Sequence, residues 1–403
     1  MEYRTVAPEE LRDFVHATSR AFGLPVPEDD HMAVDLETLE PDRCFAAIDA
    51  GVIVGTTGTY SLRTRVPGGG VLPTAGITAV GVQPTHRRRG ILTELMRLAL
   101  AQASERGEPI STLFASEGAI YGRFGYGIAS WQWGLDIDAT RGGFRRYEPH
   151  GQARLVSSAD AVATFTDIYT RATQDRPGAE AITSDDMRWV VREHDPDKPK
   201  DFYVVHEDDD GRPDAAAIYR VKHRWRYDLP SVEARARQVW ATTPQSWADI
   251  WRYLLDIDLV ARVRTGPRAA DDPIRWLLRE SRATRPTVTD GLYLRVLDVP
   301  AALAARTYRV DGRLVLDLRD PAGRVPAGSY ELVVEGGTAS VSPTDAHADL
   351  TGDVVALGAV YLGGVSWREL AGGGLVHERR DGAIDTADAM FLGTVPPWAP
   401  LPF

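Results

Sequence analysis

The chain has 403 residues, of which 43% are hydrophobic, and carries a formal net charge of −11 with an isoelectric point near 5.4. This length exceeds what one hydrophobic core usually supports, so we expect two or three domains. The acidic balance argues against nucleic acid or an anionic membrane as a partner.

Cysteine, histidine and the N-terminus carry little functional signal. Cys44 is the only cysteine, which excludes an intrachain disulfide and a cysteine metal cluster, and we expect it to fill a core strand. The nine histidines show no paired metal spacing, so we predict no metal. Met1–Arg4 lacks an apolar signal run, and no segment reaches the roughly 18 apolar residues of a membrane span. We therefore expect a cytoplasmic protein without a membrane span.

Residues 1–150 alternate helix-like and strand-like segments, which is typical of an α/β or α+β domain. Asp49-Ala50-Gly51 is a hairpin signal between two apolar runs. The expected elements are a helix at 9–22, hairpin strands at 44–48 and 52–55, a strand at 76–82, a helix that starts at 91 and ends at 106–107, and a strand at 112–115.

The most informative segment runs from Val80 to Leu92, where a strand leads through a basic turn into a helix. The guanidinium groups of Arg87–Arg89 and the free N–H groups of the starting helix would converge on one anion. Gly90 lets the backbone come close. This pattern indicates an acyl-CoA pyrophosphate site. A solvated charge run is the structural alternative; a nucleotide P-loop is set aside, because Gly90 is not followed by Lys and Ser or Thr.

The segment 116–127 adds aromatic residues and glycines just beyond the strand at 112–115. Sheets of α/β proteins commonly place ligands at this edge. The segment is therefore a candidate ligand-contacting region, and a core aromatic role is the structural alternative for Tyr126.

Two further units follow. Residues 151–290 have no counterpart of the arginine turn, so we interpret them as a degenerate copy of the first domain, kept for packing or for closing a substrate pocket. Residues 291–403 form a small α+β domain. The expected elements are strands at 201–206 and 215–222, a helix at 245–255, a helix at 301–306, strands at 314–318, 330–334 and 339–341, and a helix at 353–362.

The tail, residues 395–403, is apolar and contains four prolines. The prolines lower the entropy of the unfolded chain, and Trp398, Leu401 and Phe403 supply area to bury, so we expect the tail to dock. The residues alone favour a structural interpretation, in which the tail staples the third domain or a subunit interface.

Taken together, Val80-x-Val82, the turn Arg87–Gly90, Ser116-Glu117, the segment Tyr121–Tyr126 and a terminal Phe403 resemble the enhanced intracellular survival (Eis) type of N-acetyltransferase, within the GNAT superfamily. The resemblance covers the whole chain. It implies two tandem GNAT-fold domains of mixed α and β structure, followed by a sterol-carrier-protein-like α+β domain. The domains would be a catalytic one at 1–150, one without cofactor at 151–290, and one at 291–403 that ends in a functional carboxylate. Family members form hexamers, so the resemblance also implies a homohexamer.

The resemblance also implies the site residues. Tyr121 matches the general acid, with Tyr126 as its competitor, and the terminal carboxylate of Phe403 matches the general base. Leu92 departs from the wider superfamily, where Gly or Ala is common, so packing there must differ. The positions that match acetyl-CoA contacts are Val80, Gly81, Val82, Arg87, Arg88, Arg89, Gly90, Ile91, Leu92, Thr93, Ser116 and Glu117.

The implied reaction is direct attack of a primary amine on the thioester of acetyl-CoA, since Cys44 lies far in sequence from the turn and no Ser-His-Asp arrangement is evident. Ordinary pKa values of about 10 for tyrosine and about 8.5 for a thiol predict a nearly balanced proton transfer to sulfur. A terminal carboxylate is a weak base, so its main value would be to bind the substrate ammonium and accept its proton.

The charge of the N-terminal segment narrows the class of substrate. Residues 1–50 hold twelve Asp or Glu against four Arg, with Glu28-Asp29-Asp30 as one acidic run, and such a surface attracts polycations. A solvated loop is the structural alternative for this run. Family members acetylate aminoglycosides at several amines, which implies a role in antibiotic resistance, and also lysine side chains. The remaining alternatives are a small-amine acetyltransferase and a non-catalytic lipid-binding or scaffold protein.

Overall fold

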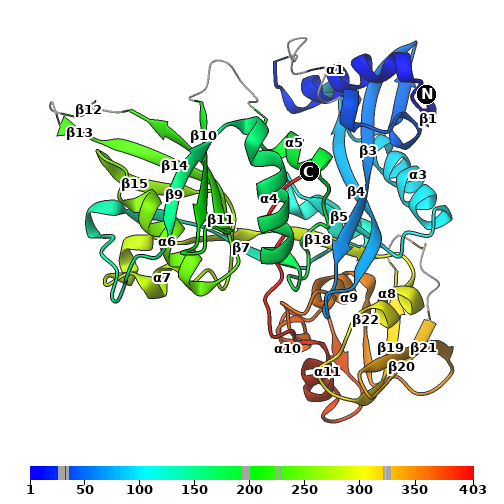
Figure 1. Cartoon of the computed structure of the whole chain (residues 1–403). Helices are drawn as coiled ribbons and strands as arrows, with labels where there is room; N and C mark the ends of the chain where they lie inside the picture. The colour runs from blue at the N-terminus through cyan, green and yellow to red at the C-terminus, as the bar shows by residue number, and fades with distance from the viewer. Residues whose placement is uncertain are drawn as a thin grey trace. The chain divides into compact units, whose positions relative to one another are not determined.

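The computed structural model describes residues 1–25, 32, 36–192, 200–223, 225–226, 229–320, 323 and 328–403, so the acidic run Glu28-Asp29-Asp30 lies outside the described residues. The chain divides into two compact units (Figure 1). None of the helices in the described ranges combines the length and apolarity needed to cross a bilayer. The first unit comprises Met1–Ser130, Leu292–Thr394 and Pro402–Phe403, and the second comprises Trp131–Gly291 and Val395–Leu401.

A seven-stranded sheet of order β1-β2-β3-β4-β5-β18-β6 organises the first unit. Neighbouring strands are antiparallel except β4 and β5, which run parallel because the helix α3 (Ile91–Glu105) connects them. The strands are β1 (Glu2–Thr5), β2 (Phe45–Asp49), β3 (Val52–Arg65), β4 (Val71–Val82), β5 (Ile110–Phe114), β6 (Gly127–Ile128) and β18 (Leu292–Val296).

Two helices cover opposite faces of this sheet. Phe45 and Ala47 of β2 pack in a core cluster with α3, whereas Ala46 and Ile48 pack in a second cluster with α1 (Leu11–Phe22). Side chains alternate between the two faces of a strand, so the two clusters lie on opposite sides. The predicted helices and the predicted hairpin are confirmed. The hairpin turns at Ala50 and Gly51, whose φ angles of 48° and 80° fit a type I′ turn.

The strand β18 completes the first sheet from a distant part of the sequence. Its second residue, Tyr293, pairs with Leu113 of β5 on one side and with Ile128 of β6 on the other. The seven-stranded sheet is therefore assembled from two sequence segments of the first unit, Met1–Ser130 and Leu292–Thr394.

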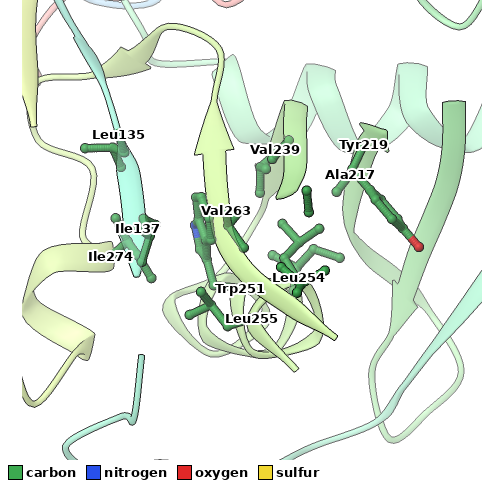
Figure 2. Packing of buried hydrophobic residues seen from close by; sticks show 14 of the residues in the cluster. Leu135, Ile137, Ala217, Tyr219, Val239, Trp251, Leu254, Leu255, Val263 and Ile274 are labelled. Carbon is green, nitrogen blue, oxygen red and sulfur yellow. The ribbon is translucent and has the colours of Figure 1, made fainter. Parts of the chain in front are cut away.

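The second unit contains a six-stranded sheet of order β8-β15-β14-β11-β10-β9. As in the first unit, two parallel strands, β14 and β15, are joined through one helix, α6. Figure 2 shows Trp251, Leu254 and Leu255 of α6 packed against the sheet. The bounds are β8 (Asp136–Asp138), β9 (Gln152–Val156), β10 (Asp201–Glu207), β11 (Pro213–Lys222), β14 (Val232–Ala241), β15 (Val260–Thr265) and α6 (Pro244–Leu255).

The helices α4 and α5 cover the other face of this sheet, whereas α7 packs in the same cluster as α6, and the remaining strands form a sheet of order β16-β7-β17 and a pair β12-β13. Phe165 and Ile168 of α4 and Met187 of α5 share a core cluster with Ala216 and Ile218 of β11. The elements are β7 (Trp131–Gly134), β16 (Arg268–Ala269), β17 (Thr287–Asp290), β12 (Trp225–Arg226), β13 (Leu229–Pro230), α4 (Ser158–Thr173), α5 (Ser184–Val190) and α7 (Ile274–Leu277).

A buried histidine cluster lies in the second unit. The Nδ1 atom of His206 lies 2.6 Å from a carboxylate oxygen of Asp214, and its Nε2 atom lies 2.9 Å from the carbonyl oxygen of His150. Both ring nitrogens face acceptors, an arrangement that favours the doubly protonated imidazole. Asp249 lies 3.8 Å from Nε2 and accepts a hydrogen bond from Tyr147. Burial by itself lowers the pKa of His206, but the hydrogen bonds to Asp214 and the His150 carbonyl outweigh it and raise the pKa above 6.5.

This raised pKa predicts a pH dependence of stability. The contribution of His206 should be fully present below the unfolded-state pKa of about 6.5 and lost as the pH rises through the higher folded-state value. We expect the unfolding midpoint of the native chain to fall between pH 6 and pH 8.5 by more than that of His206→Gln, whose side chain does not titrate. Thermal unfolding followed by circular dichroism measures both, and equal pH slopes would contradict the assignment.

The third domain has a five-stranded sheet of order β21-β20-β19-β22-β23, which belongs to the first unit. Its predicted strands and helices are confirmed. The bounds are α8 (Val299–Ala305), β19 (Gly312–Arg319), β20 (Gly328–Glu335), β21 (Thr338–Thr344), β22 (Leu350–Asp353), α9 (Val354–Val360), α10 (Trp367–Gly372), β23 (His377–Glu378) and α11 (Ala383–Phe391).

An arginine lies in the core of this domain. Arg306 is buried and donates hydrogen bonds of 2.6 Å to the carbonyl oxygens of Tyr361 and Phe391. These carbonyls lie at the C-terminal ends of α9 and α11, where helix dipoles favour a cation. The guanidinium also lies 4.6 Å from the ring centre of Phe391 and 4.9 Å from that of Tyr308. A charged group therefore occupies the core of the domain.

The tail docks, but not on the third domain. Trp398 and Leu401 are buried in the α4–α5 core cluster of the second unit. The guanidinium of Arg268 lies 4.9 Å from the ring centre of Trp398, whose backbone N–H donates to Pro177. Arg176 donates to the carbonyl of Pro396 at 2.8 Å. The expectation that the tail staples the third domain is therefore wrong.

Candidate active site

The strands β4 and β5 separate partway along the first sheet. They pair from Thr74 to Gly76 on β4, whereas the pairing of β4 with β3 continues to Val82. Among the described residues, no strand pairs with the β5-facing edge of β4 from Ile77 to Val82. Free N–H and C=O groups at such an edge can pair with the amides of an extended ligand.

A β-bulge lies within this open edge. The register between β3 and β4 shifts at Thr56–Gly58, which leaves an extra residue on β4. Ala79 has a φ of 50°, a left-handed conformation that is unfavourable for residues with a Cβ atom. The hydroxyl of Thr56 donates to the Ala79 carbonyl at 2.8 Å and helps hold the bulge. Val80, Gly81 and Val82, the predicted backbone contacts, follow directly on the open edge.

The predicted basic turn joins β4 to α3 through a 3-10 turn at Pro84–His86. Arg87 lies within 3.4 Å of the carbonyl oxygens of Val82 and Ala21, and Arg88 has a φ of 63°. The three arginines of Arg87–Arg89 are exposed, and none forms an ion pair with a described residue. A Cβ on Gly90 would meet no atom within 4 Å, so its φ of 80° is the local reason for glycine.

The helix α3 begins without a side-chain cap. Its first N–H groups, those of Ile91, Leu92 and Thr93, have no acceptor among the described residues. Unpaired N–H groups and the positive end of the helix dipole favour an anion here. Leu92, which departs from the superfamily pattern, packs partly buried against the α3-side core cluster.

In the second unit, the corresponding helix α6 has a capped N-terminus. Only Thr242 and Thr243 lie between β14 and α6. The Thr243 side chain accepts a hydrogen bond from the N–H of Ser246, and Pro244 has no N–H to offer. The N-terminus of α6 is therefore capped by neighbouring residues of the chain and offers fewer free N–H groups to an anion. This agrees with the interpretation of the second unit as a copy without the anion site.

Tyr121 lies in a 3-10 turn, Gly118–Phe124, directly after the exposed residues Ser116 and Glu117. Its side chain is 4% exposed, and its hydroxyl makes no hydrogen bond with any described residue. Burial, and then the nearby carboxylate of Glu117, raise the pKa of Tyr121 to about 12. The nearly balanced proton transfer expected from ordinary pKa values is therefore wrong, because this phenol holds its proton more strongly.

Tyr126 is tied into the sheet. Its hydroxyl lies 2.7 Å from Oγ of Ser111, and the Ser111 hydroxyl donates to the carbonyl of Ala75 at 2.9 Å. Because the Ser111 hydroxyl proton is already in the hydrogen bond to Ala75, the Tyr126 hydroxyl must be the donor of the hydrogen bond to Ser111. Burial also raises the pKa of Tyr126. Its geometry fits the alternative of a core aromatic, and Tyr121 remains the candidate acid.

The last residue of the chain lies against the same sheet. The ring of Phe403 is centred 5.3 Å from that of Phe114 and 6.5 Å from that of Tyr60. A Cβ on Gly76 would come within 3.0 Å of the Phe403 ring, so this glycine leaves room for it. Gly76 is the last residue of β4 that pairs with β5, which places Phe403 where the two strands begin to separate.

Tyr121 and Phe403 lie on opposite faces of the sheet beside β5. Tyr121 belongs to the core cluster of Leu113, whereas Phe403 contacts Phe114, the next residue of β5. Consecutive side chains of a strand point to opposite faces. A ligand lying between β4 and β5 would therefore have Tyr121 on one side of the sheet and Phe403 on the other.

Neither the buried cysteine nor a metal-ligand cluster among the described residues contributes to this site. Cys44 is buried in the α1-side cluster, as expected, and burial raises the pKa of its thiol to about 12. Such a thiol is a poor nucleophile. Within the described ranges, no three residues of the metal-binding types are grouped so that they could hold an ion.

Several acidic residues of the N-terminal segment have partners within the first unit. Glu37 is exposed and forms no ion pair with a described residue. Its neighbour Leu39 packs near Gly58 and Ala79, on the face of the sheet that Phe403 occupies. The paired groups are Glu2 and Glu10 with Arg4, Glu40 and Asp42 with Arg106, and Asp49 with His86.

Comparison with known proteins gives the family. Residues 2–129 and 181–296 each match an acetyltransferase (GNAT) domain, and residues 299–400 match a sterol carrier protein domain. An N-acetyltransferase of Streptomyces griseus is 35% identical and covers 99% of both chains. The N-acetyltransferase Eis of Mycobacterium tuberculosis is 34% identical over 85% of this chain and 84% of its own. The chain belongs to the Eis-like N-acetyltransferases.

A solved structure agrees with this assignment. Eis1 of Mycobacterium abscessus superposes over 100% of both chains with a TM-score of 0.85 and 32% identity. The predicted fold class, two GNAT domains followed by a sterol-carrier-like domain, is confirmed. The Eis-like enzyme is an acyltransferase, and its GNAT domains imply acetyl-CoA as the donor. The open edge of β4 and the uncapped start of α3 fit a long donor with amides and phosphates.

Sequence reasoning missed two residues that shape the site of this Eis-like enzyme. Nothing in the local sequence distinguishes Ala79 as the left-handed residue of a bulge. Ser111, which engages Tyr126, also had no distinguishing signal, because the next residue of β5, Thr112, is polar too.

Proposed function

We propose that this enzyme moves the acetyl group of acetyl-CoA directly to primary amines of polycationic substrates such as aminoglycosides, at more than one amine per molecule. The observation that carries the proposal is the placement of Tyr121 and Phe403 on opposite faces of the sheet beside β5. An acid for the leaving sulfur and a base for the attacking nitrogen act on different atoms, so two separate groups can take these roles.

The donor would lie along the open edge of β4. The backbone of Val80, Gly81 and Val82 would pair with its pantetheine amides. Arg87–Gly90 and the N–H groups of Ile91 to Thr93 would bind its pyrophosphate, with Ser116 and Glu117 as a second contact. The charges support this arrangement, since the three arginines form no ion pair with a described residue and the start of the helix is uncapped.

Tyr121 would stabilise the departing sulfur. As the amine bonds to the acetyl carbon, the carbon–sulfur bond breaks and its electron pair goes to the sulfur. A phenol with a pKa of about 12 is a weak proton donor to a thiolate but a good hydrogen-bond donor to it. Its main contribution would be this hydrogen bond, formed most strongly as negative charge develops, with the proton following to give the thiol.

The α-carboxylate of Phe403 would bind the substrate ammonium and accept one proton, so that the nitrogen lone pair can attack. It would then release this proton to water, which leaves the carboxylate free to accept a second proton from the nitrogen after attack, directly or through water. The ring contacts with Tyr60 and Phe114 give the last residue a defined position, which a free chain end lacks. Direct transfer needs no acyl-enzyme, in agreement with the buried thiol of Cys44.

Charge supports a polycation as the acceptor. The exposed Glu37 precedes Leu39, which packs on the face of the sheet that the Phe403 ring occupies, so we propose that Glu37 and the terminal carboxylate together favour a substrate with several ammonium groups. The buried Arg306 in the third domain disfavours the lipid-carrier alternative, because a hydrocarbon chain would have to share that core with a charge. We also propose a homohexamer, which analytical ultracentrifugation would measure.

A thiol-release assay with acetyl-CoA tests the proposed substrate class. We expect kcat/KM for an aminoglycoside to exceed that for a monoamine by about tenfold or more, with more than one thiol released per aminoglycoside molecule. The preference should fall with added salt, and Glu37→Gln should reduce it without changing kcat for the monoamine. A higher kcat/KM for a lysine peptide would favour a peptide acetyltransferase, and a higher kcat/KM for the monoamine would favour a small-amine acetyltransferase. No thiol release with any amine would contradict the enzymatic proposal.

A further inference from the structure

The second unit contains a basic pocket that includes none of the proposed acetyl-transfer residues. The cavity measures about 610 Å³ and is lined by Arg145, Arg146, Trp276, Leu277 and Arg279. This volume is in the range of small-molecule sites. Its walls come from the segment after β8 and from α7 and the residues that follow it.

Two of its arginines are held in place by the backbone. The Nε atom of Arg145 donates to the carbonyl of Leu278 at 2.8 Å, and the Nε atom of Arg279 donates to the carbonyl of Phe144 at 2.8 Å. Phe144 and Leu278 form an isolated β-bridge between the two segments that carry these arginines. Each arginine side chain is therefore bonded to the backbone of the opposite segment. The terminal nitrogens of both guanidinium groups make no hydrogen bond with a described residue. Each therefore presents a preorganised pair of donors.

The pocket concentrates positive charge in an acidic protein. None of Arg145, Arg146 and Arg279 forms an ion pair within the described part of the chain, whereas Arg220 and Arg262 of the same unit pair with aspartates. Three neighbouring cations repel one another, and an anion bound between them would offset this repulsion. Bidentate guanidinium groups match the oxygens of a phosphate.

An aromatic ring stands beside these cations. Trp276 is 68% exposed, which is unusual for so large an apolar side chain. Its indole is steadied by the guanidinium of Arg275, which lies 5.3 Å from the Trp276 ring and 4.3 Å from the Trp133 ring. A steadied, exposed indole offers a flat face for stacking.

We propose that this pocket binds a phosphate monoester carried on a flat ring, of the chemical class of a nucleoside monophosphate. The phosphate contacts Arg145, Arg146 and Arg279, and the ring stacks on Trp276. This second anion site is independent of the acetyl-CoA turn and of the proposed amine specificity.

Binding of adenosine 5′-monophosphate to the full chain, measured by calorimetry, tests the site. We expect Arg146→Gln to weaken binding about fivefold and Arg279→Gln about tenfold, because each removes a charged donor. Trp276→Ala should weaken nucleotide binding about tenfold but leave pyrophosphate binding within about twofold, because pyrophosphate lacks a ring. Adenosine, which lacks the phosphate, should bind at least about tenfold more weakly than the nucleotide.

Two controls separate this site from the others. Arg212→Gln removes an exposed arginine of the same unit outside the pocket and should change nucleotide affinity by less than about twofold. Arg88→Gln should raise the KM for acetyl-CoA but spare nucleotide binding, whereas the pocket variants should do the reverse. Nucleotide affinity that is unchanged in Arg146→Gln and Arg279→Gln, or lost in Arg88→Gln, overturns the proposal. A change of oligomeric size in the pocket variants without a change in affinity also overturns it, because the pocket would then be an interface between copies.

Discussion

One lysine appended after Phe403 is expected to abolish acetyl transfer and leave the fold intact. The added residue converts the α-carboxylate of Phe403 into an amide, which neither attracts an ammonium nor accepts its proton. General-base catalysis typically contributes about 10²-fold to 10⁴-fold, so kcat should fall by at least about 10²-fold. The thermal midpoint and the affinity for acetyl-CoA should change little, since the ring contacts of Phe403 and the turn at Arg87–Gly90 remain.

The lysine extension carries its own control. Carboxypeptidase B removes a C-terminal lysine and should restore both the native terminus and the native rate. Phe403→Leu keeps the carboxylate but loses the ring contacts with Tyr60 and Phe114, so we expect a smaller loss than with the extension. A native kcat in the extended chain before the lysine is removed would contradict the assignment of the Phe403 carboxylate as the general base.

Tyr121→Phe is expected to lower kcat by about 10²-fold, because removal of one positioned donor to a developing negative charge typically costs that much. The affinity for acetyl-CoA should stay near the native value, since the hydroxyl matters most in the transition state. Steady-state thiol release gives kcat, and equilibrium titration gives the affinity.

The pH profile distinguishes the proposed role of Tyr121 from full proton donation. Because the pKa of Tyr121 is raised to about 12, its hydroxyl stays protonated through the assay range and should produce no alkaline limb below about pH 10. An alkaline limb near pH 9 that disappears in Tyr121→Phe would contradict the raised pKa. The matched control is Tyr126→Phe, which should lower stability by about 1 kcal/mol through loss of the bond to Ser111 and change kcat by less than about threefold.

The local elements of the candidate site were predictable from short patterns. The strand before the turn, the three arginines, Gly90 and the amphipathic helix after it are adjacent in sequence, and periodicity and turn chemistry act over such distances. The core role of Cys44 was accessible in the same way. The bulge at Ala79 was not, because its left-handed conformation depends on pairing with β3 and on the hydroxyl of Thr56.

The pKa of Tyr121 shows a second limit. Residue type supplies the ordinary value near 10, but the shift to about 12 depends on how completely other residues exclude water from the phenol. Those residues include Tyr293 on β18, which is far from Tyr121 in sequence. The expectation of balanced proton transfer was therefore wrong for a reason that only tertiary packing supplies.

Composition and local motifs were enough to indicate several α/β domains, a donor with phosphates and a tail that docks. Tertiary structure decided where the tail lies: Val395–Leu401 belong to the second unit, and Phe403 lies on the first sheet beside Gly76. It also decided that β18 completes that sheet and that Tyr121 and Phe403 lie on its opposite faces. Local patterns record what each segment can form, whereas these placements depend on contacts between residues hundreds of positions apart, which are selected by the free energy of the whole fold.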